Sequence, residues 1–164
     1  MFKNHKTKLY NTLLILSRNI FFYKKIQLPD TFESRIYLMF IHFSILMIIA
    51  KQKGKKFDQK SYDYFFDNIE YNLRELGFGD VTVNKKMKEF NKILYDILLK
   101  LNIANTSDSK FKMNYKLISK YFEQFNNIKS IKYVQFETYF MNFFDFCFEL
   151  PLDNMIEDLN NFKN

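Results

Sequence analysis

Two of the chain's three glycines, Gly77 and Gly79, stand on either side of Phe78. They belong to the string LRELGFGD, residues 73–80, which separates two segments that carry apolar residues at helical spacing. Gly77 directly follows the last apolar residue of the first segment, where a helix typically ends on a left-handed residue. Asp80, or Thr82 in its place, is suited to accept from the free N–H groups at the start of the next helix. The pattern predicts a tight corner between two helices.

Helical periodicity continues along the whole chain, and strict strand-type alternation is scarce. Asp30 and Glu33, after Pro29, form a capping-box pattern at the start of one helix. The helices expected from spacing and breakers span, in order, residues 6–23, 30–52, 58–76, 83–103, 115–125, 133–148 and 152–159. The sequence therefore predicts an all-α fold, a single bundle of six to seven helices. We expect a helical core in residues 1–104 and a C-terminal extension in residues 105–164 that packs on it as one domain.

The composition argues against several classes of site. Cys147 is the only cysteine and only two histidines are present, so we expect no disulfide, no metal site and no cofactor. No phosphate-binding glycine loop and no Ser/His/Asp or Cys/His catalytic signature occurs, which predicts a protein that is not an enzyme. The apolar run Ile36–Ala50 has 15 residues. Because a membrane span needs about 20 residues, we expect a buried core helix there.

The net charge of +7 is concentrated near the N-terminus. Residues 1–60 hold twelve Lys or Arg and three Asp or Glu. This asymmetry is typical of proteins that bind a polyanionic surface, such as RNA or an anionic membrane, although a merely solvated face would have the same charge. A basic helical module that binds RNA or a membrane surface is therefore one functional hypothesis. The N-terminus lacks a cleavage site of the secretory kind, which favours a cytoplasmic protein.

Two residues on the second expected helix lie two turns apart on one face. Arg35 is close to the helix N-terminus, where a cation needs a compensating carboxylate or a role outside the fold. Asp30, Glu33 or Asp80 are candidates for that carboxylate. His42 lies on an apolar stripe, which is typical of a hydrogen-bonded core histidine. Haem ligation by His42 would have no second ligand in this sequence.

Two further segments have a structural and a functional interpretation. Arg74 precedes the glycine corner and is either a structural charge at a helix end or, with Phe78 and Lys85, part of an exposed docking knob. Residues 136–148 contain six Phe and one Tyr. They form either a buried helix or, in part, an apolar surface for a partner. Cys147 in this segment is interpreted as a small buried hydrophobic residue.

Several motifs in order resemble the ubiquinol–cytochrome c chaperone family. They are RNIFFYKKIQLPDTFESR (residues 18–35), then His42, then LRELGFGDVTVNKKMK (residues 73–88). The resemblance covers about residues 9–101. Ser34 stands where the family usually has Gly, and Glu70 where it usually has Asp. Residues from Asn105 onward carry no motif of this kind.

The resemblance implies a non-catalytic chaperone that binds newly made cytochrome b and assists assembly of the ubiquinol–cytochrome c reductase (bc1) complex. It also implies a small partner subunit, contact with the ribosome or an anionic membrane surface, and no small-molecule substrate. The expected location is cytoplasmic and peripheral to the inner membrane in a bacterium, or the matrix side in a mitochondrion. The expected partner-binding residues are Arg35, His42, Arg74, Glu75, Phe78, Asp80 and Lys85, and the expected turn residues are Pro29, Asp30, Gly77 and Gly79.

Overall fold

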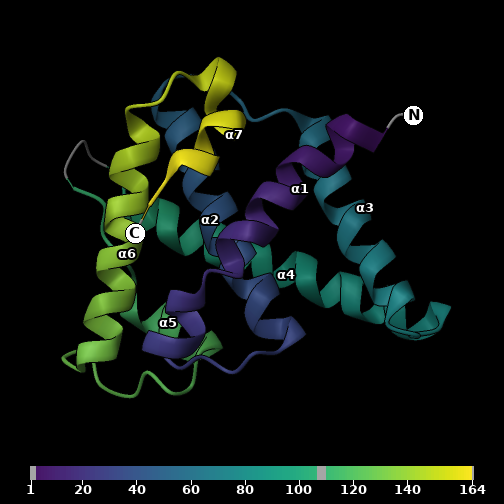
Figure 1. Cartoon of the computed structure of the whole chain (residues 1–164), viewed down its shortest axis with the longest axis horizontal. Coiled ribbons are helices and arrows are strands. Elements are labelled where there is room, and N and C mark those ends of the chain that lie inside the picture. Colours follow the sequence, from purple (N-terminus) through teal and green to yellow (C-terminus); the bar gives the residue numbers. More distant parts are fainter. Residues whose placement is uncertain (1–2, 107–109, 164) are drawn as a thin grey trace.

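A computed structural model describes residues 3–106 and 110–163, and Figure 1 shows the arrangement of the helices. The described residues form seven α-helices and contain no strand, so the all-α prediction is confirmed. The α-helices are α1 (Lys3–Ser17), α2 (Phe32–Gln52), α3 (Gln59–Glu75), α4 (Asp80–Ala104), α5 (Tyr115–Tyr121), α6 (Ile131–Phe148) and α7 (Met155–Asp158). Short irregular helices stand at η1 (Phe21–Lys25), η2 (Leu152–Asn154) and η3 (Leu159–Asn161).

Helix α2 is the centre of the molecule and packs against α1, α4 and α6. By length and composition α2 could cross a membrane, but 72% of its most apolar window is buried inside the protein. From Ile36 to Ala50 all but two residues are buried, so the prediction of a buried core helix in this run is confirmed. Burial on nearly every side explains why the helix is apolar all round rather than along one stripe.

The first helix ends earlier than predicted. Helix α1 stops at Ser17, and the π-helical turn η1 follows instead of a continuous helix to residue 23. No glycine or proline marks this break, which is made by short polar side chains. The Ser17 hydroxyl donates to the Leu14 carbonyl (2.8 Å), and the Asn19 side chain accepts from the Phe21 N–H (3.0 Å). These local hydrogen bonds compete with helix continuation, as such residues often do.

The start of α2 also differs from the expected capping box. Thr31, not Asp30, is the N-cap, and its hydroxyl accepts from the Ser34 N–H at 3.1 Å. Asp30 instead pairs with Arg35. The α4 N-cap is similarly Gly79, without a side-chain cap, and the predicted cap Asp80 is the first helical residue.

Helices α2 and α3 both end in a Schellman motif that is closed by a glycine with positive φ. At the end of α3, Gly77 has φ +97°, and Phe78 N–H donates back to the Leu73 carbonyl at 3.3 Å. At the end of α2, Gly54 has φ +74°, and Lys55 N–H donates back to the Ala50 carbonyl at 2.9 Å. This left-handed closure satisfies the last carbonyls and turns the chain sharply, so the predicted glycine corner at Gly77 is confirmed.

The C-terminal part is an aromatic layer over α2. Most of the aromatic residues of α6 are buried, Phe148 being partly exposed, so the interpretation of residues 136–148 as a buried helix is confirmed. Cys147 is buried, as expected, and burial raises the pKa of its thiol. Phe162 packs its ring on Tyr139 and Phe143, with centroids 5.5 and 5.3 Å away. This end of the chain thereby covers one side of α6. The expected helix at residues 115–125 is shorter and ends at Tyr121.

Candidate partner-binding surface

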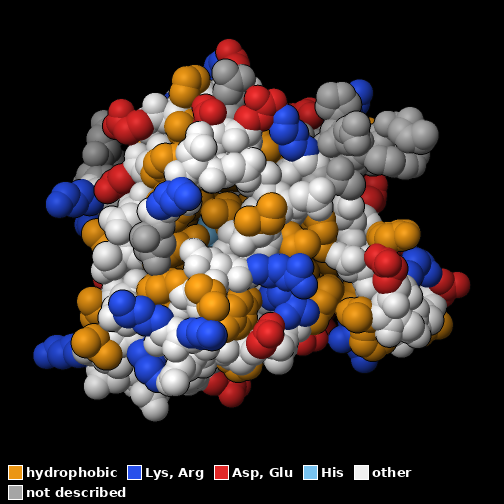
Figure 2. Space-filling view, in the orientation of Figure 1, with side chains coloured by type: hydrophobic (Ala, Val, Ile, Leu, Met, Phe, Trp, Pro, Cys, Tyr) orange, Lys and Arg blue, Asp and Glu red, His pale blue; other side chains and the backbone are white. Residues whose placement is uncertain are grey.

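A groove of about 340 Å³ opens between α1, the start of α2 and the end of α3. Most of its lining side chains are apolar, and the polar ones stand among them. The lining residues are Tyr10, Leu14, Arg18, Phe32, Arg35, Ile36, Met39, Asn72, Glu75 and Leu76. On the face that Figure 2 shows, Lys and Arg side chains gather near the middle with hydrophobic side chains beside them. An apolar groove with a few charges at its margin suits an extended or helical apolar segment better than a small polar metabolite.

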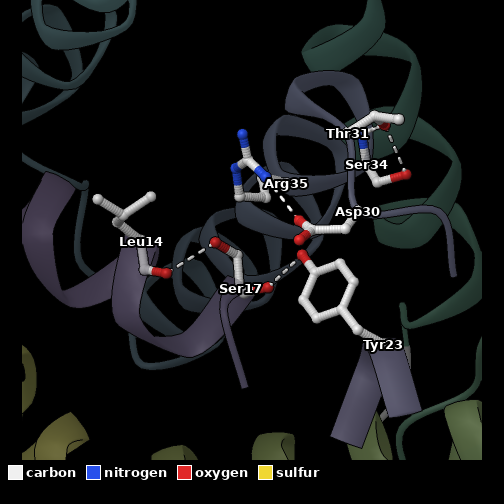
Figure 3. A network of polar contacts seen from close by, with 7 residues as sticks. All are labelled: Leu14, Ser17, Tyr23, Asp30, Thr31, Ser34 and Arg35. Atoms are coloured by element: carbon white, nitrogen blue, oxygen red, sulfur yellow. Dashed lines mark hydrogen bonds and ion pairs between the residues drawn. The ribbon is translucent and has the colours of Figure 1, made fainter. Parts of the chain in front are cut away.

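Arg35 is held at the margin of this groove by Asp30, as Figure 3 shows. The guanidinium donates to the Asp30 carboxylate at 2.7 Å, so Asp30 supplies the carboxylate that the position of Arg35 requires. Tyr23 closes the other side of this turn by donating its hydroxyl to the Ser17 carbonyl at 2.7 Å. Burial raises the pKa of Tyr23 to about 12, so the hydroxyl stays protonated as a donor. The Asp30–Arg35 pair fixes the first turn of α2 relative to the preceding loop.

The α3–α4 corner continues the apolar surface beyond the groove. It lies at one end of the molecule's long axis, where α3 and α4 meet (Figure 1). Leu76 is 59% exposed, Phe78 40% and Val81 84%, although all three are large apolar residues. We call residues 74–81 the corner. Exposed apolar side chains clustered at such a turn are typical of an interaction site rather than of ordinary surface.

Arg74 connects the two helices of the corner. It pairs with Asp80 at the start of α4 and with Glu70 one turn back on α3, the latter at 3.3 Å. The hydrogen bond that Arg74 donates to the Asp80 carboxylate is the main cause that raises the pKa of Arg74. Arg74 therefore has the structural role that the sequence left open, and part of its guanidinium surface still faces solvent. Arg74 and Asp80 are brought together at the corner, which also carries the exposed Phe78.

The remaining predicted residues divide between the surface and the core. Glu75 is exposed and lines the groove. Lys85 is exposed on α4, but the cation over the Phe78 ring is Lys86, 5.1 Å from the ring centroid. Pro29 is exposed in the loop before α2, and Gly79 has an ordinary φ of −79° with open space around its Cβ position.

His42 is the residue for which the structure contradicts a direct partner contact. It is completely buried in α2 and packs against the rings of Phe140 and Phe143, with centroids 4.8 Å away. Burial lowers its pKa to about 3, so the imidazole is neutral. Of the two alternatives, the hydrogen-bonded core histidine is the correct one. No carboxylate partner of His42 occurs among the described residues, and these residues contain no group of three potential metal ligands.

Three of the polar residues that line the groove were not predicted as site residues from the sequence. Tyr10 and Asn72 are hydrogen bonded to each other across α1 and α3. Burial raises the pKa of Tyr10, and the nearby charges of Arg18 and Arg35 oppose this rise. Arg18 was within the motif string at residues 18–35, which was a usable signal. The Tyr10–Asn72 contact had no local signal because the two residues are 62 positions apart.

A family model described as Ubiquinol-cytochrome C chaperone matches residues 24–129. The chain belongs to the ubiquinol–cytochrome c chaperone family. The matched region includes Arg35, the corner and α4, and it continues past Asn105 through α5, where the sequence motifs had ended. Membership indicates a non-enzymatic, chaperone role in bc1 assembly. No curated protein and no solved structure matches the chain.

Proposed function

We propose that this chain binds newly made cytochrome b during bc1 assembly, and that it does so with the groove and the adjoining corner. The observation that carries the proposal is the continuity of the two apolar surfaces, because Leu76 lines the groove and is also an exposed corner residue. Segments of an unassembled membrane protein are apolar and must be covered until they pack. A concave apolar surface offers that cover without any chemical step.

The charges at the margin complement this role. Arg18, Arg35 and Glu75 all line the groove. Loops that flank membrane segments carry charges, so charged groups of both signs beside an apolar groove would favour segments whose flanking charges are complementary to them. The family membership supports cytochrome b as the occupant over an unrelated apolar peptide. A small partner subunit and contact with the ribosome remain predictions.

The proposal is tested by recovering cytochrome b with the tagged chain from membranes of cells that are assembling bc1. The double variant Leu76→Ser and Phe78→Ser removes two exposed apolar groups from the corner. The control, Ile128→Ser and Ile131→Ser, removes two exposed apolar groups near the start of α6. Each truncated hot-spot side chain typically costs about 1 kcal/mol or more, so the two changes of the corner variant should lower recovery by about thirtyfold, and the control should not. Equal recovery from both variants, with unchanged helicity, would contradict the proposal.

A further inference from the structure

A second hollow, at the other end of α2, is lined by lysines. Its volume is about 520 Å³, and it lies between the end of α2, the start of α3 and the C-terminal part of α4. Lys51, Lys55 and Lys56 contribute the charges, and no acidic residue lines it. We call these three the lysine patch. The other lining residues are Met47, Ile48, Phe57, Gln59, Tyr62, Leu98 and Asn102.

The lysine patch is exposed, and Asp58 and Asp153 line a neighbouring hollow beside Lys55 and Lys56. All three side chains belong to exposed residues, and none takes part in an ion pair observed within residues 3–106 and 110–163. The two nearest carboxylates in sequence serve the fold: Asp58 caps α3, and Asp63 accepts from Gln59 at 2.9 Å. The Schellman motif at Gly54 fixes the backbone on which the lysines stand. Clustering like charges on a fixed turn costs free energy unless an external anion offsets the repulsion.

Exposed apolar side chains adjoin the patch along α4. Tyr95, Leu99 and Ile103 are each more than half exposed and follow one another at intervals of four residues, so they share one face of the helix. This face borders the hollow, because Tyr95 lies beside Tyr62, which lines it. Burial raises the pKa of Tyr62, and the nearby Tyr95 raises it further. The surface therefore combines lysines with a neighbouring row of large apolar groups.

We propose that the lysine patch and the α4 row form a membrane-contact surface, which binds the anionic headgroups of a lipid bilayer. Lysines near such a surface are attracted to its phosphates, and the apolar row reaches the boundary between headgroups and acyl chains. RNA fits less well, because it is recognised by stacking on exposed aromatic rings or arginine planes, whereas Tyr95 is the one aromatic residue of the row and Leu99 and Ile103 are aliphatic. The inference does not depend on the proposed binding of cytochrome b, which uses the opposite end of α2.

Co-sedimentation of the full chain with vesicles tests this surface. The vesicles are phosphatidylcholine alone, or phosphatidylcholine and phosphatidylglycerol in equal parts. The test variant changes Lys51, Lys55 and Lys56 to Gln, and the matched control changes Lys24, Lys25 and Lys129 to Gln. Lys24 and Lys25 precede α2, whereas the lysine patch lies at and beyond its end. The length of α2, about 30 Å, therefore separates these two control lysines from the patch. Figure 1 shows the two ends of α2 at opposite sides of the molecule.

We expect the chain to bind the anionic vesicles and not the neutral ones. The patch variant should lose about fivefold in affinity per lysine, on the order of a hundredfold in all at low salt, whereas the control keeps most of its binding. Leu99→Ser with Ile103→Ser should weaken binding without changing its salt dependence.

Equal losses in the patch and control variants would overturn the assignment. Binding of RNA oligonucleotides through the same lysines, without vesicle binding, would overturn it in favour of a nucleic-acid surface. Recovery of cytochrome b by the patch variant in detergent reports separately on the proposed function.

Discussion

The Tyr139 hydroxyl of α6 lies 2.9 Å from Nε2 of His42, in the middle of the central helix α2. Nδ1 of the same imidazole is 2.6 Å from the Leu38 carbonyl, which can only accept, so Nδ1 carries the proton. The neutral ring then accepts at Nε2, and the Tyr139 hydroxyl is the donor. One buried polar contact thus joins the C-terminal aromatic layer to the helix around which the core is built.

This contact predicts a pH-dependent stability. In the folded chain burial lowers the pKa of His42 from 6.5 to about 3, whereas in the unfolded chain the imidazole takes up a proton below about pH 6.5. The stabilisation is therefore complete above pH 6.5 and is lost as the pH falls toward 3, by about 1 kcal/mol per pH unit. Urea unfolding at pH 7 and at pH 5 should show a decrease of about 2 kcal/mol.

Two variants identify His42 as the source of this dependence. His42→Phe is less stable at pH 7, because the Tyr139 hydroxyl loses its acceptor, but it should lose much less stability between pH 7 and pH 5. Tyr139→Phe removes the donor at a cost of about 1 kcal/mol and should keep the wild-type pH dependence. An unaltered decrease in His42→Phe would mean that other groups cause the acid sensitivity.

The two glycines of the corner have different roles, which predicts different effects of alanine. Gly77 has φ +97°, so Gly77→Ala should destabilise the protein by about 1–2 kcal/mol through backbone strain. Gly79 has φ −79°, and a Cβ there meets no atom within 4 Å, so Gly79→Ala should be nearly neutral. Thermal unfolding of both variants measures the difference. Equal destabilisation would show that the left-handed residue is not what limits stability at the corner.

Features that depend on neighbours in sequence were predictable. The end of α2 near Gly54 and the corner at Gly77 follow from glycine placement, because only a residue that tolerates positive φ closes a helix in this way. The break after Ser17 was missed, since it depends on side-chain hydrogen bonds of Ser17 and Asn19 that a helical pattern does not reveal. In each case the local backbone chemistry decided the outcome.

Features that depend on distant residues were only partly predictable. The apolar stripe around His42 correctly indicated a core position, but its partner Tyr139 is 97 residues away and no spacing rule identifies it. The groove likewise combines residues from α1, α2 and α3, so the sequence could name Arg35 and Glu75 without showing that both line one hollow. Tertiary packing, rather than any motif, produces these juxtapositions.

Asp96 should hold α5 against α4. Its carboxylate accepts from Lys100 on its own helix (2.9 Å) and, on α5, from Lys120 (3.0 Å) and the Tyr121 hydroxyl (2.5 Å). Partial burial alone would raise the pKa of Asp96, but these hydrogen bonds outweigh it and hold the pKa at about 2. The contribution to stability is therefore present above about pH 4 and is lost as the pH falls toward 2.

Asp96→Asn should lower the free energy of unfolding by about 1 kcal/mol at pH 7, because charge-assisted hydrogen bonds are replaced by weaker ones. Asp145→Asn changes an exposed carboxylate of α6 and is the matched control. Hydrogen exchange should show faster opening of Tyr115–Tyr121 in the Asp96 variant only. Unchanged protection of α5 would contradict a clamping role for Asp96.

Arg74 and Asp80 can be exchanged to separate a structural role from a contact role. Arg74→Glu places a third carboxylate beside Glu70 and Asp80, so we expect loss of cytochrome b recovery with unchanged overall helicity. Adding Asp80→Arg restores a pair of opposite charges across the corner. If Arg74 acts by fixing the corner, the exchanged variant regains much of the recovery, which is the result that the two ion pairs favour. If the exchanged variant folds but does not recover cytochrome b, the guanidinium of Arg74 contacts cytochrome b directly. The position of the positive charge, rather than the geometry of the corner, would then decide binding.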